Sequence, residues 1–158
     1  MELRKGITTW KDRGVDGRTV NFKAEIIELE DGRATCAVFM NDQLIKLSKE
    51  SKDLLKMFPN FDTAVNYIKD VKIKIEENAD PDTAVLRSKV YEWKDFDKYD
   101  RRIKCIANVQ EQKDKTIITI QFSNDPEPEI ISCPNWTEAI ISMEYLLKQV
   151  NARNIRRN

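Results

Sequence analysis

Residues 18–26 read RTVNFKAEI, and residues 101–109 read RRIKCIANV. In both stretches every second residue is apolar or small, which is the period of a β-strand with one buried face. The motif Thr9-Trp10-Lys11-Asp12 precedes the first stretch at the same distance at which Glu92-Trp93-Lys94-Asp95 precedes the second. These coincidences indicate that the chain consists of two diverged copies of one unit.

The correspondence continues beyond the two alternating stretches. Without a gap, turn and strand residues coincide in the same order: Asp31 with Asp114, Phe39 with Phe122, and Asn41-Asp42 with Asn124-Asp125. A segment of different length then follows in the two copies. After it, residues 59–65 align with residues 134–140, so that Phe61 corresponds to Trp136. The repeat therefore spans nearly the whole chain.

Each copy is predicted to contain four antiparallel strands followed by one helix. The expected strands cover residues 6–10, 20–26, 35–40 and 44–47 in the first copy, and residues 89–93, 103–109, 116–122 and 129–133 in the second. Apolar residues then recur at helical spacing, after Asn60 and Asn135 as N-caps. Asn135 with Glu138 resembles a capping box. The expected class is α+β, with two tandem ββββα repeats whose antiparallel sheets pack with helices in a pseudo-twofold domain.

A four-stranded sheet with one helix buries only one sheet face and is marginal alone, so the two copies are expected to fold together. The chain is predicted to be one pseudo-symmetric domain over residues 1–158. Its expected parts are repeat one (6–76), a linker (77–88), repeat two (89–150) and a basic tail (151–158). The polar tail is expected to fray from residue 152.

Composition argues against catalysis. The chain has no His, which removes the commonest general base at neutral pH, and its 4 Gly form no phosphate-binding loop. Asp95, Asp97 and Asp100 alternate with basic residues, which favours a solvated charged loop over a cation site. We therefore expect a non-enzymatic protein without a metal or a cofactor. Lys+Arg and Asp+Glu both number 27, so strong unspecific nucleic-acid binding is not expected.

The three cysteines, Cys36, Cys105 and Cys133, are far apart in the sequence and have no metal-binding spacing. They are expected to be free core thiols in a reducing compartment. No apolar run is long enough to span a membrane, and the N-terminus has no signal-peptide core. The predicted location is the cytoplasm.

One polar sheet face is a candidate for binding single-stranded nucleic acid. Arg102, Lys104 and Asn108 alternate along the second strand of copy two, and Gln121 extends this face on the next strand. Lys23 is the corresponding basic residue in copy one. This outer face is expected to carry no acidic residue. An ordinary solvated sheet face is the equally weighted alternative.

Trp10 and Trp93 occupy equivalent places and have two possible roles. They are either core residues that cap the sheet edge or stacking platforms for unpaired bases. The core role is favoured, because repeats preserve packing positions. Trp93 is the residue expected to stack if nucleic acid binds.

Cys36, Val38 and Met40 are predicted to form an interface. In the gap-free alignment these three residues lie on one face of the strand, and Ala37 and Phe39 lie on the other. The strand is therefore apolar on both faces. Either the register of this strand differs by one residue, or a homodimer or another protein partner covers its second face.

The tandem ββββα order resembles that of the Pur-alpha and Whirly families. The passage ISCPNW (131–136) is similar to the strand, proline junction and helical Trp of the single-stranded-DNA-binding transcriptional coactivators, and IKLS (45–48) resembles it in copy one. The resemblance implies curved sheets that bind single-stranded DNA or RNA, often as a dimer or larger assembly. The basic Lys-Gly-Lys type motif of plant Whirly proteins is missing. The alternative function is an assembly, accessory or inhibitor-type protein that acts through an apolar surface on repeat one.

Overall fold

The computed structural model describes residues 3–13, 18–41, 43–44, 57–77 and 86–157. The chain divides into two compact units, Met1–Thr83 and Ala84–Asn158, each with its own sheet and helix. Most of the predicted linker, residues 77–88, lies outside the described residues. That the repeats fold together as one pseudo-twofold domain stays a prediction.

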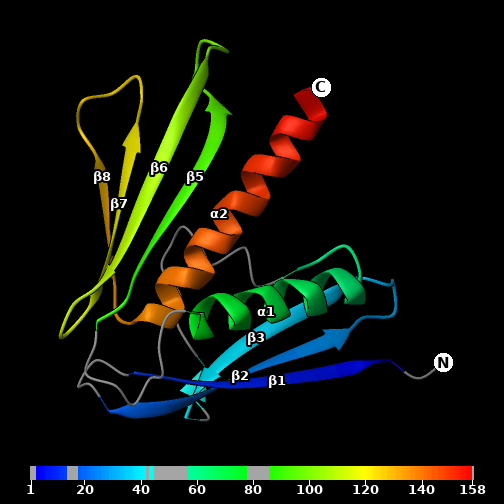
Figure 1. The fold of residues 1–158 in the computed structure, drawn as a ribbon. Helices are drawn as coiled ribbons and strands as arrows, with labels where there is room; N and C mark the ends of the chain where they lie inside the picture. Colours follow the sequence, from blue (N-terminus) through cyan, green and yellow to red (C-terminus); the bar gives the residue numbers. More distant parts are fainter. Residues whose placement is uncertain (1–2, 14–17, 42, 45–56, 78–85, 158) are drawn as a thin grey trace. The chain divides into compact units, whose positions relative to one another are not determined.

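The first unit is a four-stranded antiparallel sheet with one helix on one of its faces (Figure 1). Its strands pair in chain order: β1 (Lys5–Arg13), β2 (Thr19–Glu28), β3 (Ala34–Met40) and β4 (Gln43–Leu44). Residues 45–47, predicted to extend the fourth strand, lie outside the described residues. Helix α1 (Phe61–Glu76) contacts β1, β2 and β3.

The second unit has the same order of elements. Its sheet consists of β5 (Ser88–Phe96), β6 (Arg102–Glu111), β7 (Thr116–Phe122) and β8 (Glu129–Cys133), and helix α2 (Trp136–Arg157) contacts β5, β7 and β8. The α+β class and the ββββα order of both repeats are thus confirmed.

The C-terminal segment is helical, contrary to the expectation that it frays. Helix α2 continues to Arg157, because its last turns bind to the end of β5. Arg153 Nη2 forms an ion pair with Asp95 Oδ2 at 3.0 Å, and Asn154 Nδ2 donates to the carbonyl oxygen of Lys94 at 3.2 Å. These two bonds fix the helix end to the sheet of its own unit.

Both helices begin at the predicted caps. Asn60 Oδ1 accepts from the N–H of Thr63 at 2.8 Å, and Asn135 Oδ1 accepts from the N–H of Glu138 at 2.9 Å. The capping box at Asn135 differs from the expected form. Glu138 Oε2 accepts from the side-chain Nδ2 of Asn135 at 3.4 Å, whereas a capping box uses the backbone N–H.

The face of each sheet toward its helix forms the core, as the alternating stretches predicted. Phe22, Ala24 and Ile26 are buried in the first unit, and Cys105, Ala107 and Val109 are buried in the second. Gly6 allows α1 to approach β1 closely, because a Cβ there would lie 3.4 Å from Cζ of Phe61.

The register of β3 corrects the predicted interface. Cys36 and Val38 are buried on the core face, opposite Ile26 and Ala24 of β2, and the partly buried Met40 pairs with Phe22 on the same face. These three residues are therefore core positions, and they form no exposed apolar patch in the first unit.

The cause is a difference in turn length. The connection between β2 and β3 is residues 29–33, whereas the equivalent connection between β6 and β7 is residues 112–115, one residue shorter. Val38 consequently corresponds to Ile120, because they pair with the equivalent Ala24 and Ala107. A gap-free alignment pairs Val38 with the polar Gln121 and so assigns it to the wrong face.

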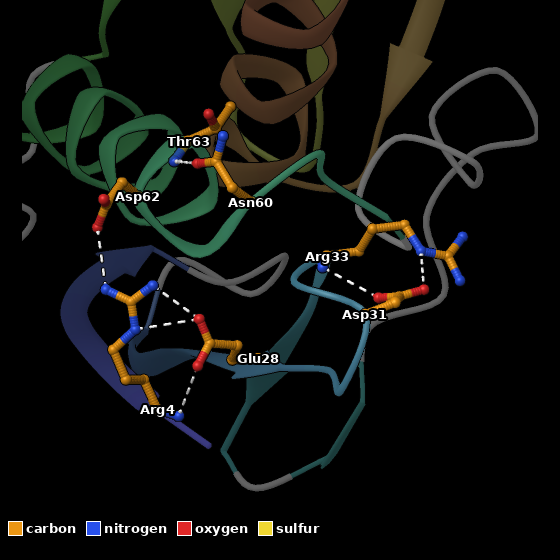
Figure 2. A network of polar contacts seen from close by, with 7 residues as sticks. All are labelled: Arg4, Glu28, Asp31, Arg33, Asn60, Asp62 and Thr63. Atoms are coloured by element: carbon orange, nitrogen blue, oxygen red, sulfur yellow. Dashed lines mark hydrogen bonds and ion pairs between the residues drawn. The ribbon is translucent and has the colours of Figure 1, made fainter. Parts of the chain in front are cut away.

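A repeated Arg–Glu pair supports the correspondence between the two units. In the first, the guanidinium of Arg4 donates to Glu28 at 2.7 Å (Figure 2). It also lies 4.6 Å from the ring centroid of Phe61. In the second, Arg87 donates to Glu111 at 2.7 Å and lies 4.8 Å from the ring centroid of Trp136. The same three-residue arrangement thus joins the sheet to the first residue of the helix in each unit.

Candidate nucleic-acid interface

Trp10 and Trp93 lie on the core faces of their sheets. Trp10 is 4% exposed and stacks on Phe22, with ring centroids 5.9 Å apart. Trp93 is half-buried and pairs with Cys105, so it also points to the helix-covered face. The core role favoured for Trp10 is confirmed. Neither ring lies on the face that carries Arg102 and Lys104.

Four of the predicted nucleic-acid-binding residues share the outer face of the second sheet. Arg102, Lys104, Asn108 and Gln121 are all exposed and alternate with the buried core residues of β6 and β7. This face is opposite α2 in the second unit (Figure 1). The sequence pattern therefore placed these side chains on one surface correctly.

The expectation that this face carries no acidic residue is wrong. Glu92 of β5 pairs with Ile106 and is exposed on the same outer face. Glu92 lies within the predicted strand 89–93, but the predicted face includes only residues of the second and third strands, and the first strand contributes Glu92 to it. Asp95 pairs with Ile103 and lies on the other face, toward the helix. Its Oδ1 accepts from the N–H of Phe96 at 2.8 Å.

The extension of β5 beyond the predicted end at Trp93 adds two residues to the outer face. Lys94 pairs directly with Lys104, and Phe96 pairs with Arg102, whose Cζ lies 5.9 Å from the Phe96 ring centroid. Together Lys94, Phe96, Arg102 and Lys104 form what we call the basic corner of the outer face. The sequence gives no periodic signal for this corner, because the charged residues Lys94 and Asp95 are adjacent and interrupt the alternation after Trp93.

The basic corner concentrates positive charge. Among the residues that the structure describes, Lys94, Arg102 and Lys104 form no ion pair, whereas Arg4, Arg87 and Arg153 each bind a carboxylate. Like charges directly opposite each other on neighbouring strands are destabilising. An anion placed over Lys94 and Lys104 would relieve that repulsion.

Lys23 occupies a different environment on the first sheet. Its Nζ lies 3.5 Å from Oε1 of Glu25 and 5.1 Å from the ring centroid of Phe39. Lys5 approaches the same Glu25 oxygen at 3.8 Å. Lys23 therefore shares its charge with a neighbouring carboxylate and belongs to the other unit, so it is not part of the basic corner.

The acidic side chain of Asp97, which follows Phe96 in the chain, forms hydrogen bonds within its own loop. The carboxylate of Asp97 accepts from the backbone N–H groups of Tyr99 and Arg101, both at 2.9 Å. The N–H of Arg101 is the main cause that lowers the pKa of Asp97 below its usual range. Within the described part of the chain no cluster of His, Cys, Asp or Glu could hold a metal ion.

The environments of the cysteines disfavour thiol reactivity. All three are buried, and none of them forms a disulfide bond. Burial raises the pKa of Cys36 to about 12, and burial followed by the nearby Asp95 raises that of Cys105 to about 11. Thiolates, the reactive form, are therefore rare at both positions. None of the described helices is long and apolar enough to cross a membrane.

Comparison of the chain with protein-family models, with curated proteins and with solved structures found no match to any of them.

Proposed function

We propose that the protein binds single-stranded nucleic acid through the outer face of the second sheet, with the basic corner as its phosphate-binding end. The observation that carries this proposal is the cross-strand pair Lys94 and Lys104 beside Arg102, without an ion pair to any described carboxylate. Phosphates supply the negative charge that this arrangement lacks. Asn108 and Gln121, farther along the same face, offer donors and acceptors to sugars and bases.

Two further features support this class of ligand. The tandem ββββα order resembles that of the Pur-alpha and Whirly families, which implies single-stranded DNA or RNA as the ligand. An open antiparallel sheet face with an aromatic residue among cations also suits a flexible strand better than a rigid duplex. Phe96, and not Trp93, is the aromatic residue of β5 that lies on the same face as Arg102 and Lys104.

The expected binding is weak and moderately dependent on salt. Because the net charge of the chain is zero, only local contacts contribute. For single strands each phosphate contact contributes about −0.7 to the log–log salt slope. Contacts from three cations therefore predict a slope of about −2.

Fluorescence anisotropy with a labelled mixed-sequence oligonucleotide tests the proposal. The double variant Arg102→Gln/Lys104→Gln is expected to weaken binding and to reduce the magnitude of the salt slope by about 1.4. The control variant Lys113→Gln/Lys115→Gln removes the same charge from the exposed turn between β6 and β7 and should bind like the wild type. Absence of binding to DNA and RNA at low salt, or equal loss in both variants, contradicts the proposal.

A protein-interaction role is the second candidate, and one observation favours it. The outer face of the first sheet exposes Ile7 (57%) and Ile27 (41%), and Leu44 of β4 is 61% exposed. Large exposed apolar side chains gathered on one sheet mark interfaces. If a second copy covers this face, sedimentation should detect a dimer that Ile7→Lys dissociates while the protein stays folded. A wild-type monomer at high concentration contradicts this candidate.

A further inference from the structure

The loop between β5 and β6, residues 97–101, presents an exposed aromatic ring beside the basic corner. Tyr99 is 66% exposed at the centre of this loop. The loop joins Phe96 directly to Arg102, which pair across the two strands. Tyr99 thus belongs to the same end of the sheet as the proposed phosphate contacts.

The loop is held in one shape by Asp97. Besides the bonds from the N–H groups of Tyr99 and Arg101, the side chain of Asp97 accepts from Arg101 Nε at 3.0 Å and from Asn124 Nδ2 at 3.3 Å. The backbone closes the loop as well, because the N–H of Asp97 donates to the carbonyl oxygen of Arg101 at 2.9 Å. The Asp97 carboxylate is only 7% exposed.

This bracing leaves the Tyr99 ring available. The four bonds to Asp97 come from the backbone and from the side chains of Arg101 and Asn124, so none depends on the phenol ring. Asp100 has a φ of 61°, a conformation that Asp adopts more readily than most residues and that completes the tight loop. An exposed aromatic ring on a braced loop loses little conformational entropy when a ligand stacks on it.

Cations surround the same ring. Lys98 Nζ and Arg101 Cζ each lie 5.1 Å from the Tyr99 ring centroid. Among the described residues Lys98 forms no ion pair, whereas Arg101 is bound to Asp97. An aromatic ring with a neighbouring cation matches one nucleotide, because the base stacks on the ring and the phosphate contacts the cation.

We propose that Tyr99 is the base-stacking residue of the nucleic-acid site and that Asp97 positions its loop, so that the site selects strands with unpaired bases. This inference rests on the proposed function and specifies it further. The basic corner binds phosphates regardless of the bases attached to them. Tyr99 adds a contact that only an unstacked base can make.

Two ligands of equal length separate these contributions: a mixed-sequence oligonucleotide and an abasic oligonucleotide with the same number of phosphates. Tyr99→Ala is expected to weaken binding of the base-containing strand about 5- to 150-fold, the range for loss of one base–aromatic stack. Its binding of the abasic strand should stay within about twofold of the wild type. Tyr99→Phe keeps the ring and should restore wild-type affinity for both.

Quenching of 2-aminopurine in the oligonucleotide gives a second readout. It should occur on binding to the wild type and to Tyr99→Phe, and it should be reduced in Tyr99→Ala, because stacking quenches this base. Circular dichroism should find all three proteins folded, since the ring is exposed.

The outcomes distinguish the inference from the proposed function. If Tyr99→Ala binds the base-containing strand as the wild type does, or weakens both ligands equally, Tyr99 is not a stacking residue. The proposed function survives that result provided that Arg102→Gln/Lys104→Gln still weakens binding. If the wild type binds neither ligand at low salt, both proposals are wrong.

Discussion

Arg87 donates to Glu111 at 2.7 Å, and the two side chains are only 1% and 6% exposed. The backbone joins the same residues, because the N–H of Glu111 donates to the carbonyl oxygen of Arg87 at 2.9 Å and the N–H of Arg87 donates to Glu111 Oε1 at 3.1 Å. The equivalent Arg4–Glu28 pair has the same bonds, yet Arg4 is 54% exposed. One repeated contact thus exists in a buried and an exposed form.

The first prediction compares these two forms. Arg87→Met leaves the buried Glu111 carboxylate without its guanidinium partner and should lower the free energy of unfolding by about 3–5 kcal/mol. The matched variant Arg4→Met should cause a much smaller loss, because solvent screens that pair. Urea unfolding of both variants measures the difference. Equal losses would show that burial does not control the contribution of this contact.

The second prediction tests the register of β3. Val38→Asp places a carboxylate in the core and should cost at least about 3 kcal/mol or prevent folding of the first unit. Phe39→Asp changes the adjacent residue on the outer face, near Lys23, and should cost about 1 kcal/mol. Thermal and urea unfolding compare the two. The reverse order of stability would restore the gap-free register and the predicted interface.

The third prediction concerns pH. Burial raises the pKa of Glu138, at the start of α2, from its ordinary 4.5 to about 7. As the pH rises from 4.5 to 7, the unfolded chain releases this proton before the folded protein does. The contribution of Glu138 to stability is therefore complete below about 4.5 and is lost as the pH rises through about 7.

Glu138→Gln removes this titration while keeping the size of the side chain. Relative to the wild type, the variant should gain up to about 3 kcal/mol in the free energy of unfolding between these two pH values. Urea unfolding of both proteins at intervals from about pH 4 to 8 measures the gain. Parallel stability curves would mean that Glu138 titrates alike in both states.

The sequence was sufficient for the features that depend on local periodicity. Alternation over residues 20–26 and 103–109 identified the central strands and their core faces, and the caps at Asn60 and Asn135 located both helix starts. Each of these signals is contained in a few consecutive residues. None of them depends on the pairing of one strand with another.

Features that depend on pairing between strands were harder to predict. Which face of β3 is buried depends on the length of the preceding turn. The two copies have similar turn residues, so the sequence alone does not reveal that their turns differ in length by one residue. The basic corner depends on where β5 ends, and the adjacent charges of Lys94 and Asp95 favour a loop after Trp93 although the strand continues to Phe96. Only the cross-strand register brings Lys94 opposite Lys104 and separates Trp93 from Arg102. Tyr99 carried no periodic signal, because its exposure depends on the bonds to Asp97.

The one-residue difference between the two turns determines how the repeats could be recombined in a chimera. Replacing residues 34–40 by residues 116–122 joins the strands at their turn boundaries and keeps Ile118 and Ile120 on the core face. A graft that follows the gap-free correspondence would instead insert Thr119 and Gln121 at the core positions of Cys36 and Val38. A strand can therefore be exchanged between the two halves only when the exchange is aligned at the turn boundaries, with the turn that precedes the strand kept at its own length.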